Sequence, residues 1–308
     1  MTVLGTQRTV WHEVQVETPE DWELLQYARD MREGRLGWAD RHHYRLEIGY
    51  REVEAEPNFE RFLSDYKVKL EVQEARKIKD LRAEGWPGFS AHHDGRFTTR
   101  FFRYLGPQRY LVEVVFAWPE QRDTGLEREV LRSIQGLRPR PEPDKNKADL
   151  PDTLTTEAPR RYEAFGLNLE LSAEWHLREA QIEPALARLV FGPQNRDRFE
   201  KRFERYGMVD LWLEGSLEDW LRQQLPPKTT VLETEILHPS GHEVVELTGT
   251  VPRESWIARL QGPLHVRAAA WRCPVDGRIY HLRSIANKEP SPTHRDSLRC
   301  CPAHCFSL

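Results

Sequence analysis

The chain has 308 residues, of which 39% are hydrophobic and ten are tryptophan, and its formal net charge at pH 7 is -4. This length predicts two domains, each large enough to bury its own core. The near balance of acids and bases argues against a protein devoted to nucleic acid. The N-terminal segment lacks the basic and apolar regions of a signal peptide, and no apolar run approaches the roughly 20 residues of a membrane-spanning helix. We therefore expect a cytoplasmic protein without a membrane span.

A stretch rich in proline and charge divides the chain nearly in half. Residues 138–160 contain almost no apolar side chain, which is typical of an exposed linker. We therefore predict a first domain over residues 1–137 and a second over residues 161–308. The same order of predicted elements on both sides of the linker indicates two diverged copies of one unit.

In the first half, the sequence pattern predicts strands followed by a helix. Apolar residues alternate with polar ones before Trp22 and again over residues 44–50, which is typical of half-buried strands. Asn58 is a candidate cap for a helix whose apolar residues recur at a period of 3.6. The residues of this apolar face are Phe59, Phe62, Leu63, Tyr66 and Leu70.

The second half repeats these elements in the same order. We predict a strand before Trp175 and further strands over residues 187–191 and 208–213. The charged residues 196–205 between them are interpreted as a solvated loop or a short helix. Ser216 and Asp219 have the spacing of a capping box and predict the start of a helix.

The C-terminal parts of the two halves align best. A single offset of 169 residues relates Arg103 to Arg272 and Leu137 to Phe306 without a gap. Each of these parts predicts a β-hairpin and then a terminal helix that begins with a Thr-x-x-Glu/Asp box. The predicted fold class is therefore α+β, with two tandem copies of a curved antiparallel sheet packed by helices.

This order of elements carries a resemblance to a known fold. The opening strand runs into Pro-Glu-Asp-Trp-Glu-Leu at residues 19–24, and a weaker form of the motif occurs at residues 172–177. Together with the amphipathic helix and the closing hairpin and helix, the motif resembles the PsbP proteins of photosystems, the Ran-binding nuclear-import factors and bacterial domains of unknown function. The resemblance implies a binding or assembly protein without a shared catalytic set, so no functional residue is carried over.

The strongest candidate for chemistry is a group of cysteine and histidine residues near the C-terminus. All four cysteines of the chain follow residue 272. The group comprises Cys273 in the turn of the second predicted hairpin, and Cys300, Cys301, His304 and Cys305 at the end of the last predicted helix. Thiolate and imidazole groups at such short spacings are the usual ligands of a tetrahedral zinc ion.

The turn that contains Cys273 departs from the usual zinc pattern at one position. It resembles a zinc knuckle, Cys-Pro-x-Cys-Gly, except that Asp276 stands where the second cysteine belongs. Two other interpretations stay open: unligated thiols that pack as small hydrophobic side chains, and a disulfide or redox role. We expect no cofactor, with zinc as the alternative.

The sequence contains no Gly-x-Gly-x-x-Gly, Walker, Gly-x-Ser-x-Gly or His-Glu-x-x-His motif. This absence leaves open whether the chain is an enzyme and favours a non-enzymatic function, and we predict no catalytic residue. Our leading hypothesis is a binding or assembly module with a protein partner, because tryptophans are frequent anchors of interfaces. The alternative is a zinc-binding or thiol-dependent protein that works through the C-terminal cluster.

Overall fold

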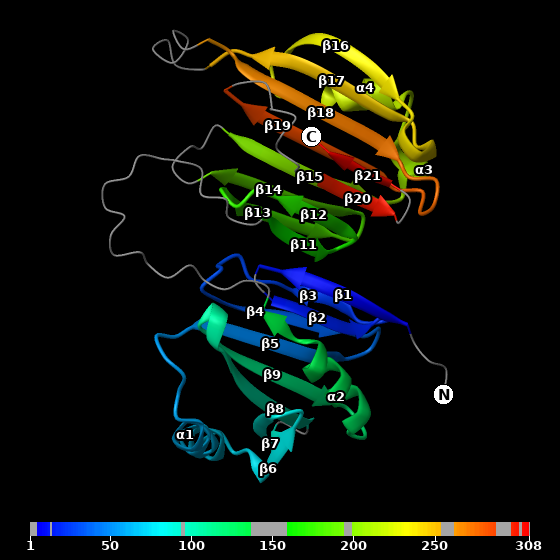
Figure 1. Cartoon of the computed structure of the whole chain (residues 1–308). Coiled ribbons are helices and arrows are strands. Elements are labelled where there is room, and N and C mark those ends of the chain that lie inside the picture. The colour runs from blue at the N-terminus through cyan, green and yellow to red at the C-terminus, as the bar shows by residue number, and fades with distance from the viewer. Residues whose placement is uncertain are drawn as a thin grey trace, which may run out of the picture. The chain divides into compact units, whose positions relative to one another are not determined.

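The computed structural model describes residues 5–12, 14–93, 96–136, 159–193, 199–253, 262–287, 297–301 and 304–307 (Figure 1). The chain divides into two compact units, residues 1–153 and residues 154–308. The boundary falls within the predicted linker, of which residues 138–158 lie outside the described residues. Each unit contains a large antiparallel sheet of its own.

The first unit is built mainly from strands. Its described strands and α-helices are β1 (Thr6–Trp11), β2 (Val14–Pro19), β3 (Glu23–Gln26), β4 (Glu33–Ala39), β5 (Tyr44–Glu52), α1 (Phe59–Val72), β6 (Arg76–Ala83), β7 (Trp86–His93), β8 (Arg96–Leu105), β9 (Tyr110–Trp118), α2 (Thr124–Ser133) and β10 (Gln135–Gly136). Seven strands form one sheet in the order β3-β4-β5-β9-β8-β7-β6. The strands β10, β2 and β1 pair separately, in that order.

The second unit has a large sheet of the same strand order. Its described strands and α-helices are β11 (Arg160–Ala164), β12 (Leu167–Leu171), β13 (Trp175–Glu183), β14 (Leu186–Pro193), β15 (Glu200–Tyr206), α3 (Val209–Trp212), α4 (Leu217–Gln223), β16 (Thr230–Leu237), β17 (Val244–Val251), β18 (Leu264–Arg272), β19 (Ile279–Ala286), β20 (Ser297–Cys301) and β21 (His304–Ser307). The large sheet runs β13-β14-β15-β19-β18-β17-β16. A smaller antiparallel sheet contains β11, β12, β20 and β21.

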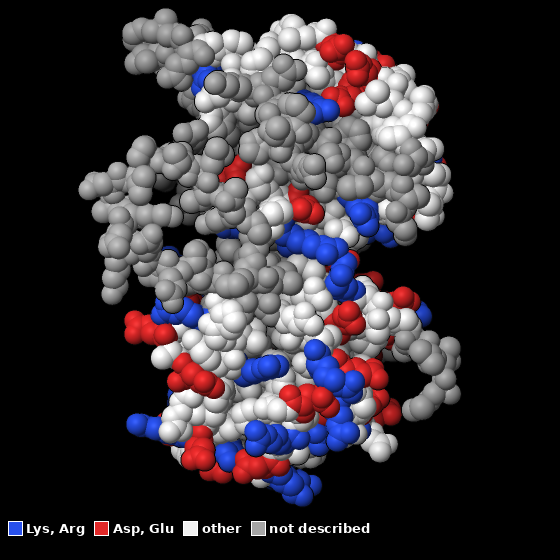
Figure 2. All heavy atoms as spheres, viewed as in Figure 1, with Lys and Arg blue, Asp and Glu red and all other residues white. Residues whose placement is uncertain are grey.

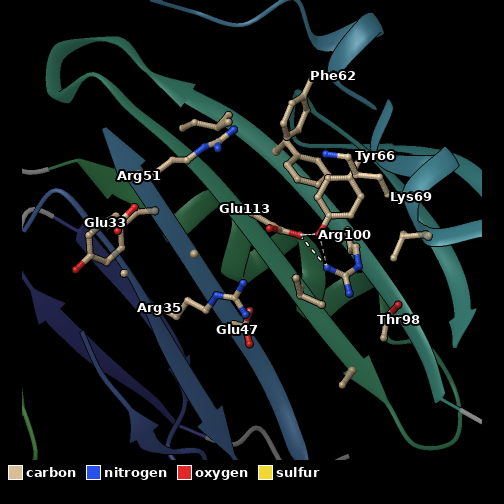
Figure 3. Close-up of a pocket in the computed structure, with 18 of the residues that line it drawn as sticks. Glu33, Arg35, Glu47, Arg51, Phe62, Tyr66, Lys69, Thr98, Arg100 and Glu113 are labelled. Carbon is tan, nitrogen blue, oxygen red and sulfur yellow. Dashed lines mark hydrogen bonds and ion pairs between the residues drawn. The ribbon is translucent and has the colours of Figure 1, made fainter. Parts of the chain in front are cut away.

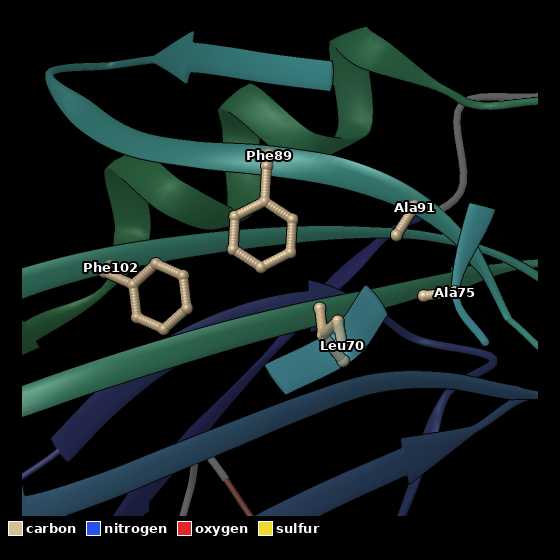
Figure 4. Packing of buried hydrophobic residues seen from close by; sticks show 5 residues of the cluster. All are labelled: Leu70, Ala75, Phe89, Ala91 and Phe102. Carbon is tan, nitrogen blue, oxygen red and sulfur yellow. The ribbon is translucent and has the colours of Figure 1, made fainter. Parts of the chain in front are cut away.

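Helix α1 follows from its cap and its apolar face. The Asn58 side chain accepts a hydrogen bond from the backbone N–H of Arg61 at 3.1 Å, which satisfies one of the free donors of the first turn. The apolar face of the helix then covers one end of the large sheet. There Leu70 packs into a cluster with Phe89 and Phe102 (Figure 4). The predicted helix is therefore confirmed.

Several other predicted elements are also confirmed. The alternating residues 44–50 lie in β5, and residues 187–191 lie in β14. The Ser216 hydroxyl accepts a hydrogen bond from the backbone N–H of Asp219 at 3.0 Å and so caps α4. Both predicted hairpins form, as β8 with β9 and as β18 with β19.

The predicted fold class is wrong, because the protein is mostly antiparallel sheet and is not a pair of helix-packed α+β copies. The clearest difference lies at the end of the second unit, where β20 replaces the predicted terminal helix. The offset of 169 places Pro302 on Ser133, the last residue of α2. A proline there clashes with the preceding helical turn and removes a hydrogen bond. The segment instead pairs with β12, with Leu298 opposite Leu169.

Two further assignments in the second unit are corrected. Residues 200–206 form the strand β15, whereas the charged stretch 196–205 is predicted as a loop or short helix. The strand forms because its charged side chains pair with side chains of neighbouring strands. The Glu204 carboxylate, for example, forms an ion pair with Arg188 of β14. Residues 208–213 were predicted as a strand but contain the short helix α3, in which the Leu213 N–H donates to the Val209 carbonyl.

The packing of α1 predicts that two truncations on this helix lower the free energy of unfolding by different amounts. Leu70 is 6% exposed in the cluster of Figure 4, whereas Val72 is 80% exposed. Leu70→Ala leaves a cavity and should lower the free energy of unfolding by about 2–5 kcal/mol. Val72→Ala should change it by less than about 0.5 kcal/mol. Urea unfolding measures both, and equal losses for the two variants would contradict this packing.

Candidate metal centre

Four side chains with metal-ligating atoms converge in the second unit. They are His242, Cys273, Cys300 and Cys301, and their ligand atoms all lie within 4.8 Å of one another. His242, Cys273 and Cys301 are buried, and Cys300 is half-buried. His242 precedes β17, Cys273 follows β18, and the two adjacent cysteines end β20.

The register of the large sheet brings His242 to Cys273. Strands β17 and β18 are antiparallel, and their last pair joins Val244 to Trp271. Continuing this register by two residues on each strand places His242 opposite Cys273. The turn after Cys273 is closed by Gly277, whose φ of +70° suits a glycine and whose N–H donates to the Cys273 carbonyl at 2.9 Å.

The two cysteines of β20 come from the smaller sheet. Adjacent residues of a regular strand point to opposite faces, yet both of these sulfurs approach the same imidazole. Their distances to His242 Nε2 are 3.6 Å from Cys300 Sγ and 3.8 Å from Cys301 Sγ. The pairing of β20 with β21 is irregular between Arg299 and Cys301. Such a bulge changes the direction of side chains and accounts for this convergence.

The surroundings of Cys273 and Cys300 favour the protonated thiol in the absence of a cation. Burial, with a smaller contribution from the nearby Cys273, raises the pKa of Cys300 to about 12. Burial also raises the pKa of Cys273, while hydrogen bonds from the backbone N–H groups of Asp276 and Val275 act in the opposite direction. These N–H groups favour a thiolate at Cys273. A bound cation would favour the thiolate form at every cysteine of the group.

The structure brings together three of the five predicted ligands, Cys273, Cys300 and Cys301. The side chains of His304 and Cys305 lie outside the described residues, although their backbone forms part of β21.

The aspartate of the knuckle-like turn, Asp276, is not one of the four convergent residues. Its carboxylate stabilises the turn by accepting hydrogen bonds from the backbone N–H of Arg278 at 3.0 Å and from the Tyr280 hydroxyl at 2.8 Å.

Sequence reasoning missed His242. The signal that could have found it is the apolar, β-branched run at residues 244–251, which predicts a strand directly after this histidine. Pairing that strand with the predicted hairpin as an antiparallel neighbour would have placed His242 beside Cys273. Without the strand, His242 was an isolated histidine 31 residues from the nearest cysteine along the chain, counting from 242 to 273.

A second cluster of buried polar side chains packs against α4. Its residues pair with one another across neighbouring strands of the large sheet. His281 Nδ1 contacts the Glu204 carboxylate, which also pairs with Arg188. Burial raises the pKa of Glu204, but His281 and Arg188 outweigh this effect and lower the pKa to about 2. Burial lowers the pKa of His281. The Trp220 ring packs edge-on against the imidazole at 5.6 Å.

The described surface carries charges of both signs. Figure 2 shows Lys and Arg side chains interspersed with Asp and Glu on the described part of the face it presents. No helix among the described residues has both the length and the apolar character needed to cross a bilayer.

Comparisons with known proteins assign no family to the chain. No family model matches it, and no curated protein matches it. Among solved structures, a protein of Bacteroides thetaiotaomicron VPI-5482 is similar at a TM-score of 0.28 and 11% identity, over 49% of each chain. The apo form of the immunity protein TplEi of T6SS from Pseudomonas aeruginosa is similar at a TM-score of 0.36 and 8% identity, over 94% of this chain and 90% of that one. The resemblance to PsbP proteins and Ran-binding import factors stays a prediction.

Acid should destabilise the protein through the pair of Glu204 and His281. Folding lowers the pKa of Glu204 from 4.5 to about 2, so its contribution is complete above 4.5 and is lost as the pH falls toward 2. The lowered pKa of His281 adds a loss that begins below 6.5, where the unfolded ring takes up a proton.

Urea unfolding between about pH 7 and pH 3 measures this loss. Glu204→Gln should lower stability at neutral pH and show a smaller further loss in acid. Glu235→Gln, at an exposed position of β16, serves as the control and should follow the wild type. The same acid dependence in Glu204→Gln and in the wild type would contradict the assignment.

Proposed function

We propose that this protein is a non-enzymatic binding module whose second unit holds one structural zinc ion through His242, Cys273, Cys300 and Cys301. The observation that carries the zinc proposal is the spacing of the ligand atoms. Zinc bonds of about 2.3 Å to sulfur and about 2.0 Å to nitrogen, at tetrahedral angles, require a sulfur-to-nitrogen separation of about 3.5 Å. The two separations from His242 Nε2 are 3.6 and 3.8 Å.

The ligand types favour zinc over other common cations. Three thiolates and one imidazole form a soft set with no carboxylate among the four convergent residues. Calcium and magnesium take oxygen ligands, whereas tetrahedral Cys₃His sites are a standard form of structural zinc. A reducing, cytosolic location is the one we propose, because it would keep the thiols available for the metal.

The arrangement favours a structural role for the ion. Four protein ligands fill a tetrahedral zinc ion and leave no position for a substrate or an activated water. His242 and Cys273 belong to the end of the large sheet, and Cys300 and Cys301 belong to the smaller sheet. The ion would therefore link two sheets of one unit and hold the short strand β20 in place.

Zinc content tests this proposal. Purified protein should contain about one zinc ion per chain, and removal of the ion by a chelator should lower the free energy of unfolding, because binding energy at such sites is folding energy. His242→Ala and Cys273→Ser should each lose most of the bound zinc. Elemental analysis and thermal unfolding measure these effects.

The chain offers a matched control for the histidine ligand. His238 is exposed and lies four residues before His242, so His238→Ala should keep both the zinc and the thermal stability of the wild type. A zinc-free wild type with every thiol titratable would contradict the proposal and leave the cysteines as ordinary buried side chains. Equal zinc loss in His238→Ala and His242→Ala would contradict the ligand assignment.

A further inference from the structure

The first unit contains a large groove on one face of its seven-stranded sheet, with a volume of about 1170 Å³. Strands β4, β5, β8 and β9 form its floor, and α1 forms one wall (Figure 3). All of its lining residues lie between Asp30 and Ala117. The groove therefore belongs to the first unit alone and does not depend on the proposed zinc site.

The groove exists because only part of this sheet face is covered. Along β9, Val112, Val114 and Phe116 are fully buried on one face, whereas Glu113 and Val115 on the other face are half-buried and line the groove. In the second unit, β19 has the same place in its sheet, and seven consecutive residues of it are buried. Both faces of the central strand are therefore covered in the second unit, whereas one face stays partly exposed in the first unit.

The centre of the floor is hollow and its charges are paired. Gly49 lies between Arg35 of β4 and Glu113 of β9 in the sheet register, and its lack of a side chain leaves space there. Arg35 pairs with Glu47 at 3.2 Å, and Arg100 pairs with Glu113 at 2.8 Å. These pairs satisfy one another and leave no charge at the centre that calls for a ligand.

Unpaired cations lie away from the centre. Within the described part of the chain, Arg51, Lys69 and Arg96 line the groove and have no ion-pair partner. Two acids, Asp30 and Glu33, also line it and form no ion pair with any residue that the structure describes. Glu33 is opposite Arg51 in the register, so acids balance that end of the groove. The excess of positive charge therefore lies toward Arg96.

The dimensions of the floor suit an extended ligand. Arg51 is paired with Leu111 of β9, and Thr98, two residues after Arg96, is paired with Ala117 of the same strand. Six residues separate these two positions on β9, which corresponds to about 20 Å at about 3.3 Å per residue. A ligand that reaches both ends must be elongated and must carry negative charge near Arg96.

The aromatic residues of the wall favour a peptide over a sugar chain. The Tyr66 ring packs against Phe102 and Phe89, and the guanidinium of Arg100 lies over it at 5.7 Å from its centre. Phe62 packs edge-on against Phe102 at 5.2 Å. These rings are engaged within the protein and do not form a flat platform for a sugar ring.

We propose that this groove binds an extended acidic peptide segment of a partner protein, with carboxylates of the peptide at the Arg96 end. The site goes beyond the proposed zinc function and gives the expected protein partner a place on the first unit. Carboxylates of the peptide would form charge-assisted hydrogen bonds with the unpaired guanidinium groups.

Fluorescence anisotropy with fluorescein-labelled hexaglutamate tests the proposal on the full chain. Binding should be saturable and should weaken as salt is added, because it depends on exposed charges. Arg96→Glu should weaken it roughly tenfold or more, since a charge-assisted bond is lost and a repulsion is added. Arg128→Glu makes the same charge change on the exposed face of α2, outside the groove, and should leave the affinity within about twofold of the wild type.

Three results would overturn the proposal. One is the absence of hexaglutamate binding up to millimolar concentration, and another is equal weakening by Arg96→Glu and Arg128→Glu. The third is tighter binding of an oligogalacturonate of the same charge, which would assign the groove to an anionic sugar. Unchanged thermal unfolding of both variants would show that they are folded, as expected for exposed arginines. His242→Ala should keep wild-type peptide binding, so failure of the zinc proposal is distinguishable from failure of this one.

Discussion

The junction between β20 and the large sheet of the second unit brings three thiols and an imidazole into one small, mostly buried space. Without a cation, burial favours the protonated thiol at Cys273 and at Cys300, and the pKa of Cys300 is raised to about 12 by burial with a contribution from Cys273. Weak contacts of Cys300 and Cys301 with His242 are then among the interactions that join these cysteines to the large sheet. A divalent cation bound here would replace these weak contacts by four strong bonds. Under the zinc proposal, the same four residues would form a loosely held cluster without the ion and a rigid link with it.

The two units secure their C-terminal segments by different chemistry. In the first unit, α2 carries the buried Glu127, whose carboxylate pairs with Arg122 and accepts hydrogen bonds from Thr99 and Trp118. The Ser133 hydroxyl, at the end of the same helix, accepts a hydrogen bond from the backbone N–H of Glu17 at 2.9 Å. The second unit has a short strand at this place, and its cysteines face the histidine and cysteine of the large sheet. A metal site suits a segment too short to bury an apolar face of its own.

The part of the fold that the sequence could predict is the part set by local pattern. The cap at Asn58, the apolar face of α1 and the two long hairpins follow from residue spacing alone, and the structure contains them. The prediction failed where long-range pairing overrides local signals. The charges of β15 look like those of a solvated loop until Glu204 is seen to pair across strands with Arg188. Pro302 is the local signal against a terminal helix, because a proline within a helix removes a backbone hydrogen bond and clashes with the preceding turn.

The candidate metal centre was predictable only in part, because one of its residues is brought to the others by long-range strand pairing. Three of its ligands were found because cysteines are rare in this chain and gather near its end. His242 could not be recognised without the register between β17 and β18, because the distance along the sequence hides the pairing. The duplication of the two halves stays a prediction. The shared strand order of the two large sheets is an observation of topology, and the terminal segments differ in both structure and chemistry.

We propose that the four convergent residues form one tetrahedral metal site. X-ray absorption at the zinc edge of the purified protein tests it most directly, because it reports the atoms bound to the metal. The proposed site should give a shell of three sulfurs at about 2.3 Å and one nitrogen at about 2.0 Å. A shell of oxygen and nitrogen alone, or a spectrum that is unchanged in Cys300→Ser, would contradict it.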